Sequence, residues 1–262
     1  MNQASIHTRR SLLSATVAAL SFAQAPPKVT EATSEIPTSD TLLKFNADGT
    51  VRPFAGNTVI CHLQQQGRTR DAVERIHEAL RRCSFVHKLG ILPPDSYHMT
   101  VYPGANDQGR ELTGWPSDLP KDASIEECNR AIADRMRQFH LECRLPLRMK
   151  VDQAKTIANR RASTLRMVGA DAGEEQKIRK LRDRLVDVFR FRDNKHDEYG
   201  FHVTLAYQLS VFTPNEQAEY RAILEKNVPI IAASAPAFEF GNPEFCTFPN
   251  MYRFDIQVLL ST

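Results

Sequence analysis

The chain has 262 residues, of which 42% are hydrophobic and 25% are charged, and its formal net charge is +3. This composition is ordinary for a globular protein with a sizeable core, arranged as one large domain or two small ones. So mild a charge argues against a dedicated binder of duplex nucleic acid, which carries a concentrated basic face. A small phosphorylated ligand needs only a few local donors. The five cysteines are scattered without the spacing of a zinc site.

The N-terminal stretch has the pattern of an export leader. Residues 1–30 contain no acidic residue, and Arg9-Arg10 precedes an apolar run that ends at Ala23. We therefore expect residues 1–25 to direct export to the periplasm or outside the cell, and the run is too short for a membrane span of ~20 residues. A mitochondrial presequence and the disordered tail of a cytoplasmic protein are the alternatives. Residues 26–41, rich in Pro, Ser, Thr and Glu, are expected to form a disordered linker.

A single folded domain is expected over residues 42–262, with one half at 42–145 and the other at 146–262. The elements predicted in the first half are a strand at 58–63, an amphipathic helix at 69–83, a strand at 96–102 and a helix at 125–143. Residues 103–122 are expected to be a rim over a cleft or a plain surface loop.

The second half repeats the order of the first. Its predicted elements are strands at 147–157 and 163–168, a helix at 174–191, a strand at 200–207, a helix at 214–227, and strands at 230–233, 237–240 and 251–260. Strand, helix, His-x-Thr strand and helix thus occur twice, which favours a duplicated, two-lobed body.

The two central strands carry the same short motif. His98-Met99-Thr100-Val101 and His202-Val203-Thr204-Leu205 each place a histidine and a threonine two residues apart. Because side chains alternate across a strand, the histidine and the threonine share one face while the apolar residues share the other. One such string is weak evidence, but two copies in a chain with eight histidines indicate a site.

Cleavage of a phosphodiester requires a base for the attacking oxygen, an acid for the leaving oxygen, and donors to the non-bridging oxygens. Histidine, with a reference pKa of ~6.5, can serve as either acid or base near neutral pH. We therefore predict His98, Thr100, His202 and Thr204 as catalytic residues, with no metal or cofactor required, and with the acid and base roles of the two histidines left open.

Further candidates are weaker. Tyr102 shares the predicted face of His98, so it could stack on a base or contact a phosphate, and a packing role is about as plausible. Tyr207 falls on the predicted apolar face and is expected in the core. Three arginines could reach an anionic ligand: Arg160, Arg161 and Arg166.

At these motifs the chain resembles the 2H phosphoesterase superfamily, named for two His-x-Ser/Thr-x motifs on paired strands. Around the first motif it is similar to an uncharacterised bacterial and fungal branch of the RNA ligase and cyclic nucleotide phosphodiesterase-like group, at Gly104, Asp107, Arg110 and Trp115-Pro116. The resemblance implies an α+β fold of two lobes related by a pseudo-twofold axis, each an antiparallel sheet backed by helices, with both histidines facing a central cleft. It also implies metal-independent phosphodiester hydrolysis or cyclic phosphodiesterase activity on a small nucleotide or short oligonucleotide bearing a 2′,3′-cyclic or 2′-linked phosphate.

Other interpretations stay open. The fold could carry a catalytically silent nucleotide-binding module, or a metal-dependent hydrolase could use His196, Asp197 and His202, although their spacing matches no familiar ligand set. The histidines could also be merely structural, which the duplication disfavours. We expect a monomer.

Overall fold

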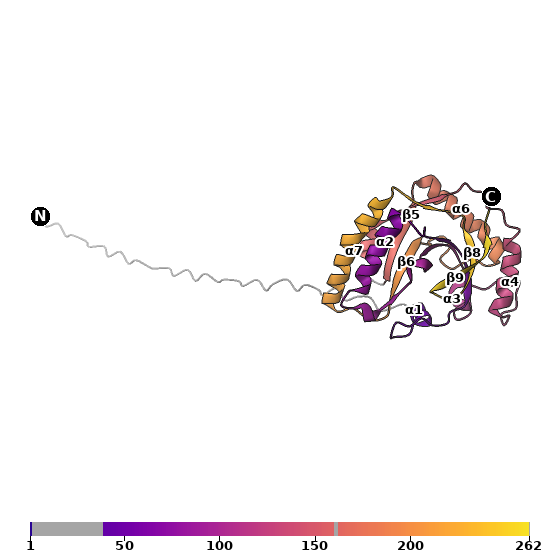
Figure 1. The fold of residues 1–262 in the computed structure, drawn as a ribbon, viewed down its shortest axis with the longest axis horizontal. Coiled ribbons are helices and arrows are strands. Elements are labelled where there is room, and N and C mark those ends of the chain that lie inside the picture. The colour runs from indigo at the N-terminus through magenta and orange to yellow at the C-terminus, as the bar shows by residue number, and fades with distance from the viewer. Residues whose placement is uncertain (2–38, 160–161, 262) are drawn as a thin grey trace. The chain divides into compact units, whose positions relative to one another are not determined.

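The computed structural model describes Met1 and residues 39–159 and 162–261. Within these residues, nine strands form one curled antiparallel sheet with helices packed against it (Figure 1). The predicted α+β class with an antiparallel sheet is therefore confirmed. The strands of both halves join in this single sheet, and their division into two lobes related by a pseudo-twofold axis stays a prediction.

The predicted leader after Met1, and the predicted linker up to residue 38, lie outside the described residues. Helix α1 (Ser39–Lys44) begins inside the segment predicted as linker. Thr41 is buried, and Lys44 pairs with Asp40 at 2.9 Å, so these residues belong to the folded body. None of the helices in the described ranges is long and apolar enough to cross a membrane.

The first half follows the predicted order. After α1 come β1 (Gly56–His62), α2 (Arg68–Arg81), β2 (Leu89–Ile91), β3 (His98–Asn106), α3 (Arg110–Thr113) and α4 (Ile125–Met136), with 3-10 turns at Val86–Lys88 and Pro94–Ser96. A capping box of Ser124 and Glu127 starts α4. The helix ends at Met136, before the predicted residue 143, because the chain turns there so that Leu141 N–H bonds to the carbonyl of Ser261.

The second half departs from prediction in three places. Its elements are β4 (Leu147–Val151), α5 (Gln153–Ala158), β5 (Ala162–Gly169), α6 (Ala172–Phe189), β6 (His202–Gln208), α7 (Pro214–Ser234), β7 (Phe238–Phe240), β8 (Glu244–Asn250) and β9 (Arg253–Leu259). The strand predicted at 147–157 stops at Val151, because Asp152 caps α5. Residues 230–233 are helical rather than extended, since α7 continues through Pro229 with Val228 and Ile231 buried. Strand β8 was not predicted.

The order of the strands places the two motif strands side by side in the sheet. That order is β7-β4-β5-β6-β3-β1-β8-β9, with β2 pairing on β6. Met99 of β3 is paired antiparallel with Val203 of β6. This register sets His98 opposite Thr204 and Thr100 opposite His202, so the four predicted catalytic residues form a compact square on one face.

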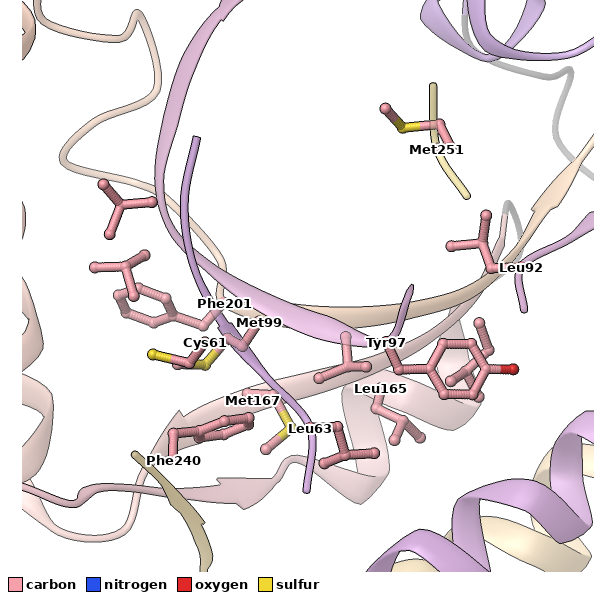
Figure 2. Packing of buried hydrophobic residues seen from close by; sticks show 14 of the residues in the cluster. Cys61, Leu63, Leu92, Tyr97, Met99, Leu165, Met167, Phe201, Phe240 and Met251 are labelled. Carbon is pink, nitrogen blue, oxygen red and sulfur yellow. The ribbon is translucent and has the colours of Figure 1, made fainter. Parts of the chain in front are cut away.

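The opposite face of these strands packs into the core. Met99, Val101, Val203 and Leu205 are fully buried, and Figure 2 shows Met99 near Cys61 and Phe201 in this packing. Burial of such side chains stabilises the fold by about 1.5–3 kcal/mol each. Helix α6 packs against β3, β4 and β5, and α2 packs against α7 (Figure 1). The core thus fixes both motif strands from behind.

Candidate functional site

The four motif side chains line one cavity of about 730 Å³. His98, Thr100, His202 and Thr204 are each half-buried, whereas the residues between them are buried. The alternation predicted from the sequence therefore places all four residues on the cavity face. A volume of this size is typical of a small-molecule site.

The two histidines are held in the same way. The Nδ1–H of His98 donates to the carbonyl of Ser96 at 2.7 Å, and the Nδ1–H of His202 donates to the carbonyl of Gly200, also at 2.7 Å. A carbonyl only accepts, so Nδ1 carries the proton and Nε2 of the neutral ring is left with a free lone pair. Each ring is thus fixed in the tautomer that lets Nε2 accept or return a proton.

Each motif strand also contains a β-bulge. In β3 the extra residue, relative to the pairing with β1, is Val101. In β6 the extra residue, relative to the pairing with β5, is Leu205. A bulge reverses which face the following side chains occupy, and both strands accordingly show the same order of half-buried and buried residues.

These bulges show that the predicted faces of both tyrosines are wrong, and Tyr102 has the packing role that was the alternative. Tyr102 does not share the face of His98: it is fully buried, stacks on Phe189 with ring centroids 4.7 Å apart, and donates its hydroxyl to the carbonyl of Phe191. Tyr207, expected in the core, instead lines the cavity. Simple alternation predicts neither position, because a bulge depends on the partner strand.

The backbone carbonyls at the two bulges accept hydrogen bonds from different kinds of donor. The carbonyl of Val101 accepts a hydrogen bond from the guanidinium of Arg182, which is fully buried on α6. The carbonyl of Leu205 accepts one from the backbone N–H of Leu92. A buried carbonyl needs a hydrogen-bond donor. A side chain provides this donor at the bulge of β3, and a backbone N–H provides it at the bulge of β6.

The surroundings of His98 are apolar. The Phe254 ring lies 4.3 Å from the His98 ring, and His62 of β1, directly opposite in register, lies 6.2 Å away. Burial lowers the pKa of His98 to about 3, with smaller contributions from His62 and His202, against the raising effect of the bond to Ser96. His98 is therefore neutral at neutral pH.

The surroundings of His202 are cationic. Arg166 of β5 is its register partner, and Lys44 also lines the cavity. Burial lowers the pKa of His202, and the charges of Arg166 and Lys44 lower it further, against the raising effect of the Gly200 carbonyl. Both cations line the cavity beside this histidine, and Lys44 is also paired with Asp40 at 2.9 Å.

Tyr199 is a cavity residue that sequence reasoning missed. Its hydroxyl is hydrogen-bonded to the side chain of Thr100, and burial raises the pKa of Tyr199 to about 12, so it stays protonated. The guanidinium of Arg182 lies 4.1 Å from its ring centroid. No local signal marks Tyr199, because the first motif has no tyrosine at the equivalent position.

An aromatic wall closes the His98 end of the cavity. It consists of Phe54, Phe248 and Phe254. Phe248 lies 5.2 Å from Phe254 and 6.4 Å from Phe54, measured between ring centroids. Such a surface can take the flat face of a nucleobase.

Two other histidines do not line the cavity. The Nδ1 of His62 is paired with Glu244. The Nε2 of His196 is bonded to Asp183 at 2.9 Å, while Asp197 is paired with Arg192. Two of the three proposed ligands of a metal-dependent hydrolase, His196 and Asp197, are therefore paired away from His202. Across the described ranges no three His, Cys, Asp or Glu side chains are grouped to hold a metal ion.

The remaining predicted features are two arginines and the 103–122 loop. Arg160 and Arg161 lie outside the described residues. In the 103–122 loop, the guanidinium of Arg110 lies 3.9 Å from the ring of Trp115, whose indole N–H donates to Pro120. The loop thus packs on itself, and its first residues, rather than Trp115, line the cavity.

Comparison with known proteins agrees with this architecture. A conserved protein of unknown function from Agrobacterium tumefaciens has a crystal structure that matches with a TM-score of 0.76 and 29% sequence identity, over 86% of this chain and 94% of that chain. No functionally curated protein matches the chain. The family model labelled 2H-phosphodiest, described as "Domain of unknown function (DUF1868)", matches residues 44–159, a range that includes His98 and Thr100. The part of the chain that carries the first motif is thus similar to this 2H family.

Proposed function

We propose that the protein hydrolyses a phosphodiester of a small nucleotide or short oligonucleotide, carrying a 2′,3′-cyclic or 2′-linked phosphate, by general acid and base catalysis. The observation that carries the proposal is the pair of histidines, each held through Nδ1 by a carbonyl two residues upstream and each lining the same cavity. A merely structural histidine would not need this duplicated orientation.

Each part of the proposed reaction has a candidate group in the cavity. The Nε2 of one histidine takes a proton from the attacking water as the new P–O bond forms. The other histidine, in its charged form with a proton on both nitrogens, gives the Nε2 proton to the ribose oxygen as the old P–O bond breaks. The hydroxyls of Thr100 and Thr204, opposite the two histidines, donate to the non-bridging oxygens, where negative charge is concentrated.

The cavity walls favour a nucleotide over a simple phosphoester. The aromatic wall offers stacking for a base, while Arg166 and Lys44 offer positive charge for the phosphate. Arg166 forms no ion pair with any described carboxylate, so its charge is available to a ligand. The cavity thus offers both an apolar surface and positive charge, the two features that a nucleotide requires.

The test is a substrate panel followed by phosphorus NMR. Purified protein is incubated with 2′,3′-cyclic nucleotides, 2′–5′ dinucleotides and cyclic dinucleotides, with and without EDTA. We expect turnover of the first or second class, unchanged by EDTA and absent from the His98→Ala/His202→Ala double variant, which controls for contaminating nucleases.

Two results would replace this proposal. Binding of panel members without turnover would indicate a silent nucleotide-binding module. Loss of activity on chelation, with recovery on one specific metal, would indicate metal-assisted hydrolysis.

A further inference from the structure

We infer that Tyr199 is a positioning residue for the proposed reaction, which orients the hydroxyl of Thr100 toward the phosphate. The phenol hydroxyl of Tyr199 donates to the oxygen of Thr100, so that the single hydroxyl proton of Thr100 is left for a non-bridging oxygen of the substrate. This inference rests on the function proposed above, and it gives a role to a cavity residue that lies outside both motifs.

Tyr199 lies beside residues of both motif strands. It directly precedes Gly200, whose carbonyl holds the Nδ1 of His202, and its ring centroid lies 6.0 Å from that of His202. Its hydroxyl is hydrogen-bonded to the side chain of Thr100, the residue opposite His202 in the register of β3 and β6. One side chain thus lies against the threonine of the first motif and the histidine of the second.

The ring of Tyr199 is held by two neighbours. The guanidinium of Arg182 lies 4.1 Å from its centroid, and the ring of Phe201 lies 5.6 Å away at an angle of 71°. Arg182 is itself fully buried, and its position is fixed by the hydrogen bond that it donates to the carbonyl of Val101. The same arginine therefore supports the backbone that follows Thr100 and the ring whose hydroxyl is bonded to Thr100.

The direction of the hydrogen bond between Tyr199 and Thr100 follows when a phosphate is bound. Burial raises the pKa of Tyr199 to about 12, against the lowering effects of Arg182 and of the bond to Thr100, so the phenol keeps its proton near neutral pH. A threonine hydroxyl has one proton to donate and two lone pairs that accept. Phosphate oxygens only accept, and a hydrogen bond to a charged oxygen is about twice as strong as one between neutral groups. Thr100 therefore donates to the phosphate and accepts from Tyr199.

The first motif has a different residue at the equivalent position. Asp95 stands three positions before the histidine of the first motif, as Tyr199 does in the second. The carboxylate of Asp95 is largely exposed, is paired with Arg70 at 2.9 Å and does not line the cavity. The equivalent position of the first motif therefore cannot orient Thr204.

A double-mutant cycle tests the inference. Tyr199→Phe keeps the ring against Arg182 and removes the hydroxyl, so we expect it to lower kcat/KM for 2′,3′-cyclic AMP by about fivefold, the contribution of one hydrogen bond between neutral groups. In a Thr100→Val background, which has no hydroxyl to orient, the same change should alter kcat/KM by less than about twofold. In a Thr100→Ser background, which keeps the hydroxyl, the loss of about fivefold should return.

Tyr252→Phe is the matched control. It removes a phenol hydroxyl from a half-buried tyrosine that does not line the cavity, and it should leave kcat/KM unchanged in all three backgrounds. A loss of the same size for Tyr199→Phe in all three backgrounds would overturn the inference, because the hydroxyl would then act without Thr100. That result, like the absence of a loss in every background, leaves the proposed reaction standing.

A binding measurement separates the inference from the proposed function. The dissociation constant of adenosine 2′-monophosphate is measured by titration calorimetry for the same variants, so that no turnover is needed. An increase of about fivefold for Tyr199→Phe, absent in the Thr100→Val background, supports the inference even if the protein cleaves no member of the substrate panel and the proposed reaction fails. Equal dissociation constants with and without the Tyr199 hydroxyl overturn the inference even if the protein hydrolyses 2′,3′-cyclic AMP.

Discussion

Strands β3 and β6 are alike in backbone and different in surroundings. Both place a histidine and a threonine on the cavity face, both hold Nδ1 with a carbonyl two residues upstream, and both contain a bulge at the same position. Yet His98 stands beside Phe254, whereas His202 stands opposite Arg166. The repeated strand thus provides the geometry, and the neighbouring strands decide which chemistry each histidine meets.

Removal of either histidine should have the largest effect on activity. We expect His98→Ala and His202→Ala each to lower kcat by roughly 10²–10⁴, the usual contribution of a positioned proton carrier. His140→Ala, an exposed histidine away from the cavity, should have no effect.

A substrate with a p-nitrophenolate leaving group sharpens this test, because that group departs without a proton. His202→Ala should then lose far less activity than His98→Ala. This prediction takes His98, whose pKa is lowered by burial to about 3, as the base and His202 as the acid. Equal losses for the two variants on this substrate would contradict it.

The second prediction concerns the bulge carbonyls. Arg182→Met should lower the free energy of unfolding by about 3 kcal/mol, because the carbonyls of Val101 and His196 lose their donor in a buried environment. Urea unfolding followed by circular dichroism measures this, with Lys180→Met, an exposed residue of the same helix, as the control. A variant as stable as the wild type would show that the bulge of β3 does not need the hydrogen bond from Arg182.

The third prediction concerns the threonines. Thr100→Val and Thr204→Val keep the β-branched shape and remove the hydroxyl. Loss of a hydrogen bond to a charged group, worth roughly 1.5–3 kcal/mol, should lower kcat/KM by about ten- to a hundredfold. Thr→Ser at the same positions should retain most activity. Because the Tyr199 hydroxyl is hydrogen-bonded to Thr100, Tyr199→Phe should lower kcat/KM less than Thr100→Val does. Values of kcat/KM within twofold of the wild type for both Val variants would exclude contacts between these hydroxyls and the phosphate.

The smallest effect expected is a shift in the pH profile. With His98 as base and His202 as acid, kcat/KM is limited at low pH by protonation of His98 and at high pH by deprotonation of His202. Burial, Arg166 and Lys44 lower the pKa of His202, so activity should fall as the pH rises through values below its usual ~6.5.

Lys44→Met removes one of these cations, so the pKa of His202 should rise and the high-pH limb should move up by about half a pH unit. The low-pH limb should stay in place, because Lys44 is not among the groups that lower the pKa of His98. Lys150→Met is the control. Movement of the low-pH limb instead would exchange the roles of the two histidines.

Local sequence was sufficient where a regular period decides the structure. The alternation of His98 with Met99, and of His202 with Val203, determined which side chains share a face. The apolar spacing in α2 and α6 determined their faces in the same way. These features depend on residues a few positions apart, whose relative directions the backbone geometry fixes.

Pairing between distant segments decided the rest. The bulge at Val101 turns Tyr102 into the core and the bulge at Leu205 turns Tyr207 out of it, because each strand must match a partner far away in sequence. The same pairing sets Arg166 opposite His202. Residues 230–233 look like a strand in isolation but are helical, because the buried face of α7 continues past Pro229. In each case tertiary packing overrides the local secondary-structure propensity, because burial of side chains contributes more free energy than the local preference of the backbone.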